Sequence, residues 1–132
     1  MGRGAVILLD THAWVWWASG SAQLSAQAKK VLAREKCLMV SAISCWEIST
    51  LVRLEKLKFD RPAEQWIEQS LGDPMLECIE ISSKVAVLAG SLNDFHGDPA
   101  DRLIVATAQA LGCKLVTKDR KITDYLKGHT IW

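Results

Sequence analysis

Short apolar runs alternate with longer helical patterns along the chain. The run Ala5–Leu9 is apolar throughout, as expected for a strand that is covered on both faces of a sheet. Four later segments have the composition of further strands and are separated from it by helical stretches. These predicted strands are Cys37–Ala42, Met75–Ile81, Lys114–Thr117 and Thr130–Trp132.

Between the strands, apolar residues recur every three or four positions, which is typical of amphipathic helices. The predicted helices are Ser25–Lys36, Ile43–Leu57, Pro62–Leu71, Ser82–Leu92, Pro99–Leu111 and Asp119–Leu126. Strands that alternate with helices predict the α/β class, with a parallel sheet covered by helices on both faces. No repeat or linker divides residues 1–132, so we expect a single domain.

Composition narrows the class of protein further. Hydrophobic residues make up 49% of the chain and charged residues 23%, which is globular rather than disordered composition. No apolar run is long enough to cross a bilayer or to serve as a signal peptide, so we expect a soluble cytoplasmic protein. A formal net charge of +1 excludes a broad basic field for nucleic acid, so an anionic substrate would need a local site.

The four cysteines have no spacing that suggests zinc or a paired motif. They are Cys37, Cys45, Cys78 and Cys113. We expect them to be small buried hydrophobic residues. Six tryptophans are many for this length; Trp14 and Trp17 lie three positions apart, so we expect most of this aromatic surface in the core.

Acidic residues follow the predicted strands. Asp10 ends the first strand, Glu47 lies one helical turn beyond the second, and Asp119 comes two residues after the fourth. Asp101 lies near the start of the helix that precedes the fourth strand. Because the carboxyl ends of parallel strands share one edge of a sheet, these side chains should converge there.

Converging carboxylates repel one another, and a cation can neutralise them. Oxygen ligands without histidine or cysteine favour Mg²⁺ or Mn²⁺ over zinc. Such an ion can bind a phosphate and promote attack by water, so the pattern predicts metal-dependent cleavage of phosphodiester bonds.

A simpler interpretation is that these acids are helix caps. Asp10, Asp98 and Asp119 are good N-caps for the segments that follow them, and Ser44 and Glu47 have the spacing of a capping box. The chain would then be a non-catalytic α/β binding module. Metal dependence separates the two interpretations. The sequence has no P-loop motif, which argues against a nucleotide-binding protein of that type.

Four stretches of the sequence carry a family resemblance. They are residues 8–12 (LLDTH), 41–48 (SAISCWEI), 96–108 (HGDPADRLIVATA) and 115–119 (LVTKD). In this order the chain resembles PIN-domain ribonucleases, specifically the VapC-type toxins of toxin–antitoxin pairs. The resemblance implies a three-layer α/β/α PIN-like fold with a five-stranded parallel sheet.

The resemblance also implies a function, a metal and partners. The implied function is that of an endoribonuclease that depends on Mg²⁺ or Mn²⁺ and cuts RNA. The implied partners are a cognate antitoxin, which holds the enzyme inactive, and a second copy of the chain in a homodimer. The family's catalytic and metal-binding acids match Asp10, Glu47, Asp101 and Asp119. Supporting positions match Thr11, Thr117 and Asp98, of which Asp98 is expected to be a helix cap first.

Several neighbouring residues are open to two interpretations. His12 and His96 could contact RNA, but bonding to backbone near a strand end is the more common role. We expect Arg102 to form an ion pair, and Trp46 to be a core or dimer contact rather than a base-stacking platform. Basic residues occur in the stretch Arg53–Arg61 and beside Asp119 at Lys118 and Arg120; the latter two are the better candidates for phosphate.

Overall fold

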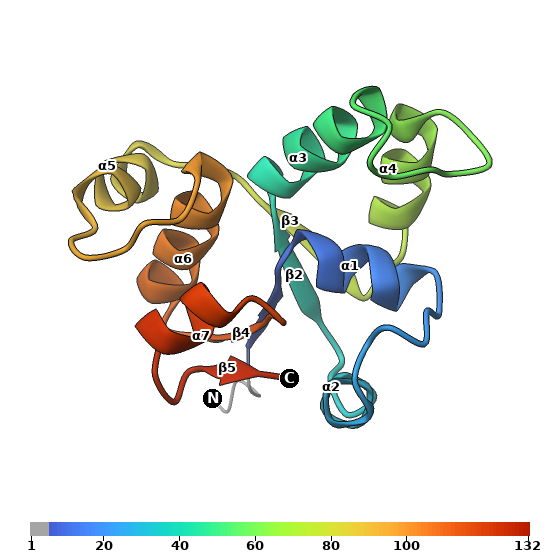
Figure 1. Cartoon of the computed structure of the whole chain (residues 1–132). Coiled ribbons are helices and arrows are strands. Elements are labelled where there is room, and N and C mark those ends of the chain that lie inside the picture. Colours follow the sequence, from blue (N-terminus) through green and yellow to red (C-terminus); the bar gives the residue numbers. More distant parts are fainter. Residues whose placement is uncertain (1–5) are drawn as a thin grey trace.

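The computed structural model describes residues 6–132, and their centre is a five-stranded parallel sheet (Figure 1). The strands are β1 (Ile7–Leu9), β2 (Leu38–Ser41), β3 (Leu76–Ile79), β4 (Lys114–Val116) and β5 (Thr130–Ile131). Their order across the sheet is β3-β2-β1-β4-β5. This confirms the predicted α/β class; of the predicted first strand, Ala5 lies outside the described residues.

The middle strand β1 fixes the position of the two strands beside it. Leu8 of β1 aligns with Met39 of β2 on one side and with Leu115 of β4 on the other. Because all three strands run in the same direction, their carboxyl ends meet at one edge of the sheet. The backbone leaves this edge at Asp10, whose N–H donates to the Val116 carbonyl across a distance of 3.1 Å.

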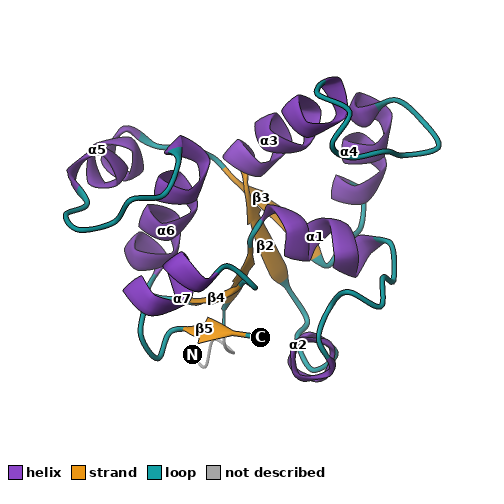
Figure 2. Cartoon of the chain, in the orientation of Figure 1, coloured by secondary structure: helices purple, strands orange, loops and turns teal. Residues whose placement is uncertain are grey.

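Helices cover both faces of the sheet (Figure 2). They are α1 (Thr11–Ala18), α2 (Ala26–Leu32), α3 (Ala42–Arg53), α4 (Ala63–Leu71), α5 (Ser83–Ser91), α6 (Pro99–Leu111) and α7 (Arg120–Tyr125). Successive side chains of a strand point to opposite faces, so Ile7 and Leu9 pack into one core with Trp14 of α1. Leu8 packs into a second core with Ile104 of α6. The predicted three layers are therefore present.

Three helices differ from the sequence-based expectation. Helix α2 ends at Leu32 instead of Lys36, because the chain turns at Ala33 and Arg34. From the sequence, no helix is predicted over residues 11–18, where the structure has α1, although the spacing of Trp14 and Trp17 is helical. Trp14 is fully buried. Helix α3 ends at Arg53 instead of Leu57, because Glu55 has φ 59°, a left-handed conformation that ends a helix.

The prediction that the cysteines are buried is correct only in part. Cys113 is buried, Cys45 and Cys78 are half-buried, and Cys37 is exposed in the turn before β2. Cys37 is therefore not a core residue. Trp46 is 56% exposed on α3, which excludes the core alternative of the core or dimer contact expected for it; the dimer contact stays a prediction.

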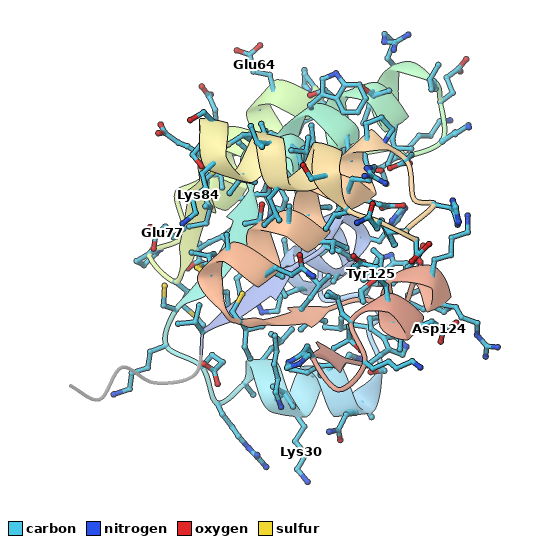
Figure 3. The ribbon with its side chains drawn as sticks, turned by 90° about the vertical axis from the view of Figure 1, so that its left-hand side faces the viewer. Lys30, Glu64, Glu77, Lys84, Asp124 and Tyr125 are labelled. Atoms are coloured by element: carbon cyan, nitrogen blue, oxygen red, sulfur yellow. The ribbon has the colours of Figure 1, made fainter. Side chains whose placement is uncertain are left out.

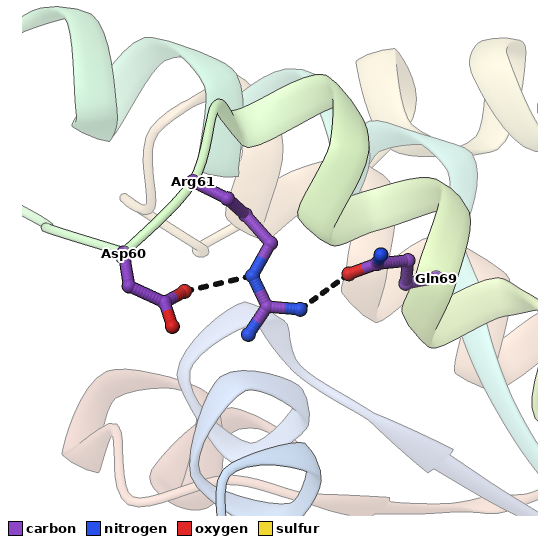
Figure 4. Close-up of polar contacts among 3 residues, drawn as sticks. All are labelled: Asp60, Arg61 and Gln69. Atoms are coloured by element: carbon purple, nitrogen blue, oxygen red, sulfur yellow. Dashed lines mark hydrogen bonds and ion pairs between the residues drawn. The ribbon is translucent and has the colours of Figure 1, made fainter.

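Many charged side chains lie on the surface, as Lys30, Glu64, Glu77 and Lys84 do in Figure 3. Between residues 6 and 132 a single ion pair forms: Arg61 donates to Asp60 at 2.7 Å and also contacts Gln69 (Figure 4). The rest of the basic stretch Arg53–Arg61 is solvated, and its role in RNA binding stays a prediction. No helix in this part of the chain is long and apolar enough to span a membrane.

Candidate functional site

One cleft of about 560 Å³ opens where the carboxyl ends of the strands meet. The ten residues that line it are Asp10, Thr11, His12, Trp16, Glu47, Asp98, Asp101, Ile104, Lys118 and Asp119. All four acids predicted as catalytic are among them, as are Thr11 and Asp98. The lining residues are spread over more than a hundred positions of the sequence, so the topology of the sheet is what brings them together.

Asp10 stands between β1 and α1 and is the most buried of these acids, with 9% of its surface exposed. Its Oδ1 accepts from the Ala13 N–H at 2.8 Å, which makes it the N-cap of α1. Burial raises the pKa of the Asp10 carboxyl, while a hydrogen bond from the Thr117 hydroxyl and that from Ala13 oppose the rise.

Thr117 connects two of the acids from a fully buried position. Its hydroxyl oxygen accepts from the Asp119 N–H at 3.0 Å, which leaves its proton free to bond Asp10. Asp119 in turn caps α7 by accepting from the Ile122 N–H at 3.0 Å. Thr117 therefore fixes the backbone at Asp119 and the side chain of Asp10 at the same time.

The Thr11 hydroxyl holds Glu47, and the Ser44 hydroxyl holds Thr11. Thr11 bonds the Glu47 carboxylate, and the oxygen atoms of Thr11 and Ser44 lie 2.9 Å apart. One hydroxyl proton cannot serve both partners, so Thr11 donates to Glu47 while Ser44 donates to Thr11. Ser44 was not predicted in this role; it is fully buried, and its contact lies 33 positions away in the sequence, which no local pattern indicates.

The predicted capping box at Ser44 and Glu47 is wrong. Strand β2 runs to Ser41, and the Ser41 side chain caps α3 by accepting from the Ile43 N–H at 3.1 Å. Helix α3 therefore begins one turn earlier than the box would require. The shift releases Ser44 and Glu47 from the cap and lets both face Thr11.

Asp98 and Asp101 begin helix α6. Asp98 is exposed and caps the helix, because its Oδ1 accepts from the Asp101 N–H at 2.8 Å. Asp101 is half-buried, and its pKa is raised to about 7. Burial is the largest cause; the charges of Asp98, Asp119, Glu47 and Asp10 follow in that order. Four other carboxylates of the cleft thus disfavour the charged form of Asp101.

Asp10, Asp98 and Asp119 are helix caps as predicted, and the acids also converge on one cleft. Asp10, Asp98 and Asp119 each accept a helix N–H with one oxygen, which leaves the other oxygen available to a ligand. In residues 6–132, no three His, Cys, Asp or Glu side chains lie close enough as they stand to hold a metal ion. The acids share a cleft without meeting at one point.

Arg102 does not form the predicted ion pair. Its guanidinium donates to the carbonyl oxygens of Phe95, Leu92 and Ala89 at 2.7, 2.8 and 2.9 Å. These carbonyls belong to the end of α5 and the loop that follows, where helical partners run out. Arg102 therefore holds the loop that leads into Asp98.

The two histidines differ in position. His12 is exposed and lines the cleft, with its ring centroid 5.7 Å from that of Trp16. His96 is exposed and is not among the lining residues. Of the two basic neighbours of Asp119, Lys118 lines the cleft and Arg120 does not.

Thr117→Val is expected to weaken both stability and any activity of this site. The variant keeps the shape of the side chain but leaves the Asp119 N–H without its acceptor, which costs about 1–3 kcal/mol. Misplaced acids should lower activity by roughly 10- to 100-fold. Thermal unfolding and RNA cleavage check this, with Thr107→Val as control, since the Thr107 hydroxyl bonds only its own helix. Equal activity of the two variants would contradict the prediction.

The fold agrees with what sequence comparison finds. Residues 7–127 match the PIN domain, and the chain belongs to the PIN-domain family. It is of the VapC type: Ribonuclease VapC22 of Mycobacterium tuberculosis is 36% identical over 129 residues, which cover 96% of this chain and 98% of that protein. The predicted family resemblance is thereby confirmed.

Solved structures share the fold at lower identity. A toxin–antitoxin complex from Klebsiella pneumoniae contains a chain with a TM-score of 0.67 and 24% identity, covering 98% of this chain and 97% of that one. VapBC2 from Rickettsia felis, bound to a DNA fragment from its promoter, contains a chain with a TM-score of 0.66 and 21% identity. The match covers 95% of this chain and 96% of that one. Both confirm the fold that the sequence predicted.

Proposed function

We propose that this protein is an endoribonuclease toxin that hydrolyses RNA phosphodiester bonds with the help of Mg²⁺ or Mn²⁺. The observation that carries the proposal is the gathering of four aspartates and one glutamate in one cleft, where the other four carboxylates help to raise the pKa of Asp101. Such repulsion is costly unless the site binds a cation. The likeness to a VapC ribonuclease over nearly the whole chain supports the same activity.

The donor set fits a hard divalent cation. The cleft offers oxygen atoms from four aspartates and one glutamate and has no cysteine among its lining residues. Asp10, Asp101 and Asp119 would hold the ion, directly or through water, and Asp98 would assist. When bound, the ion would supply positive charge for the scissile phosphate and promote its attack by water.

The protein's own residues prepare the reaction. Glu47, fixed by Thr11 and Ser44, accepts a hydrogen bond from the attacking water and orients it. Thr117 keeps Asp10 and Asp119 aligned through its two hydrogen bonds. Lys118 lies at the same cleft and can balance the charge of a phosphate. No covalent intermediate with the protein is needed.

Regulation and location follow from the same family. A chain of this fold occurs in the structure from Klebsiella pneumoniae that is described as a toxin–antitoxin complex. We therefore propose that a cognate antitoxin covers the toxin and holds it inactive, that the toxin pairs with a second copy of itself, and that it acts in the cytoplasm.

Cleavage of a labelled, structured RNA pool by the antitoxin-free protein tests the activity. We expect cleavage with Mg²⁺ or Mn²⁺ and none in EDTA, and we expect either ion to raise the Tm of the protein because it binds only the folded state. A folded protein that neither cleaves RNA nor responds to the ions would favour the binding module whose acids are only caps.

A further inference from the structure

One wall of the cleft is aromatic and basic, in contrast to its acidic floor. Trp16, in helix α1, is half-buried and lines the cleft. Three side chains surround its ring: His12 and Trp132, each with a centroid distance of 5.7 Å, and Lys118, whose ammonium lies 6.0 Å from the ring centroid. The proposed mechanism uses neither Trp16 nor His12.

The ring of Trp16 is fixed on one side and accessible on another. Trp132 and the core around β1 support it, so the indole keeps its place at the cleft. Lys118 stands at the outer limit of a cation–π contact, and its side chain is exposed. Because the lysine chain is flexible, it can turn to a phosphate while a flat group takes its place over the indole.

Charge explains why such a platform is needed. Five carboxylates line the cleft, and Lys118 is the only lysine or arginine among its described lining residues. With a net charge of +1, the chain offers no broad positive field to attract RNA. Contacts that do not depend on charge therefore add to what a bound cation supplies, and stacking of a base on an aromatic ring is such a contact.

We propose that Trp16, Lys118 and His12 form a nucleotide-binding subsite beside the scissile phosphate. One unpaired nucleobase stacks on the Trp16 indole, and the adjoining phosphate is bound by Lys118 and His12. The inference rests on the proposed ribonuclease activity and deepens it by naming the residues that bind the nucleotide next to the cleaved bond.

Binding of a fluorescein-labelled single-stranded oligoribonucleotide tests the subsite. Affinity is measured by anisotropy in the Asp101→Asn background, with Mg²⁺ present, so that the RNA stays intact. We expect Trp16→Leu to weaken binding by about 5- to 150-fold, the range for one stacked base, and Trp16→Phe to restore most of it. Lys118→Gln should lower the salt dependence by about 0.7 in the slope of log K against log salt.

Trp17→Leu is the matched control. Trp17 is the next residue of the same helix and equally half-buried, but it lines other hollows and not the acidic cleft. A series of oligonucleotides, each lacking the base at one position, is then tested with the protein that has Trp16 and with Trp16→Leu. Together with that substitution, these oligonucleotides complete a double-mutant cycle between the ring and the base. Removal of the stacked base should weaken binding to the protein with Trp16 and not to Trp16→Leu.

The outcomes separate this subsite from the proposed function. The unsubstituted protein is assayed in parallel for cleavage of the same RNA with Mn²⁺. If it cleaves the RNA while Trp16→Leu binds as tightly as Trp17→Leu, the subsite is wrong and the ribonuclease stands. If the unsubstituted protein neither binds nor cleaves RNA, the proposed function fails, and the subsite fails with it.

Discussion

Replacing Asp101 by asparagine is expected to abolish RNA cleavage and, at the same time, to stabilise the metal-free protein. Substitution of a residue that only supports a metal ligand costs up to about 100-fold, so loss of a ligand should exceed that figure. The gain in stability has a separate cause. Asp101 is repelled by four other carboxylates, and asparagine removes this repulsion while keeping a side chain of the same size.

The stability difference should depend on pH in a defined direction. The pKa of Asp101 is about 7 in the folded protein, above its value of 3.8 in the unfolded chain. The uncharged form therefore favours folding, and this contribution is complete below about pH 4 and is lost as the pH rises through 7. Because Asp101 is half-buried and solvent screens its charge, we expect Asp101→Asn to gain about 1–2 kcal/mol at pH 8.

Chemical denaturation of the metal-free proteins at several pH values measures this difference. Asp124→Asn is the control, since Asp124 is an exposed residue of α7 that does not line the cleft (Figure 3). Saturating Mg²⁺ should reverse the order of stability between the original protein and Asp101→Asn. Normal RNA cleavage by Asp101→Asn would contradict the role proposed for Asp101. A loss of stability at pH 8 in Asp101→Asn but not in Asp124→Asn would contradict the proposed repulsion.

The sequence predicted the sheet and the meeting of the acids because both follow from topology. Each strand is marked by its own apolar run, and parallel strands have only one edge at which their carboxyl ends lie. Asp10 and Asp119 could therefore be brought together from positions more than a hundred residues apart. Asp101 joined them because a helix start is visible in Asp98 and Pro99.

The partners of these acids could not be predicted in the same way. The contacts of Ser44 with Thr11 and of Arg102 with three carbonyls depend on side-chain rotamers and on the packing of segments far apart in sequence. Sequence favoured an ion pair for Arg102 because acids are its neighbours along the chain. In space its nearest acceptors are the carbonyls left unpaired at the end of α5.

Arg102→Met is expected to be the most destabilising of the substitutions considered for this protein. Methionine keeps the apolar part of the side chain but removes the donors to three carbonyls. Hydrogen bonds to a charged group contribute about 1.5–3 kcal/mol each, and solvent can replace some of them here. We expect a loss of about 3 kcal/mol and a Tm about 10 °C lower.

The loop held by Arg102 has little freedom to adjust. Phe95 is buried within it, and a Cβ on Gly97 would lie 2.5 Å from the Phe95 ring and 2.9 Å from Cβ of Asp101. The backbone of the loop therefore packs directly against a residue of the cleft. Release of the loop should disturb Asp98 and Asp101, so cleavage should fall even at temperatures where the variant remains folded.

Amide hydrogen exchange separates this local effect from general instability. In Arg102→Met, faster exchange should be concentrated in residues 92–98, with smaller changes in the strands. Arg102→Lys should recover part of the stability, because one ammonium can reach some but not all of the three carbonyls. Arg120→Met, at an exposed position of α7, provides the control. If Arg102→Met and Arg120→Met unfold at the same temperature, the guanidinium does not hold the loop, and the carbonyls of Ala89, Leu92 and Phe95 are satisfied by water instead.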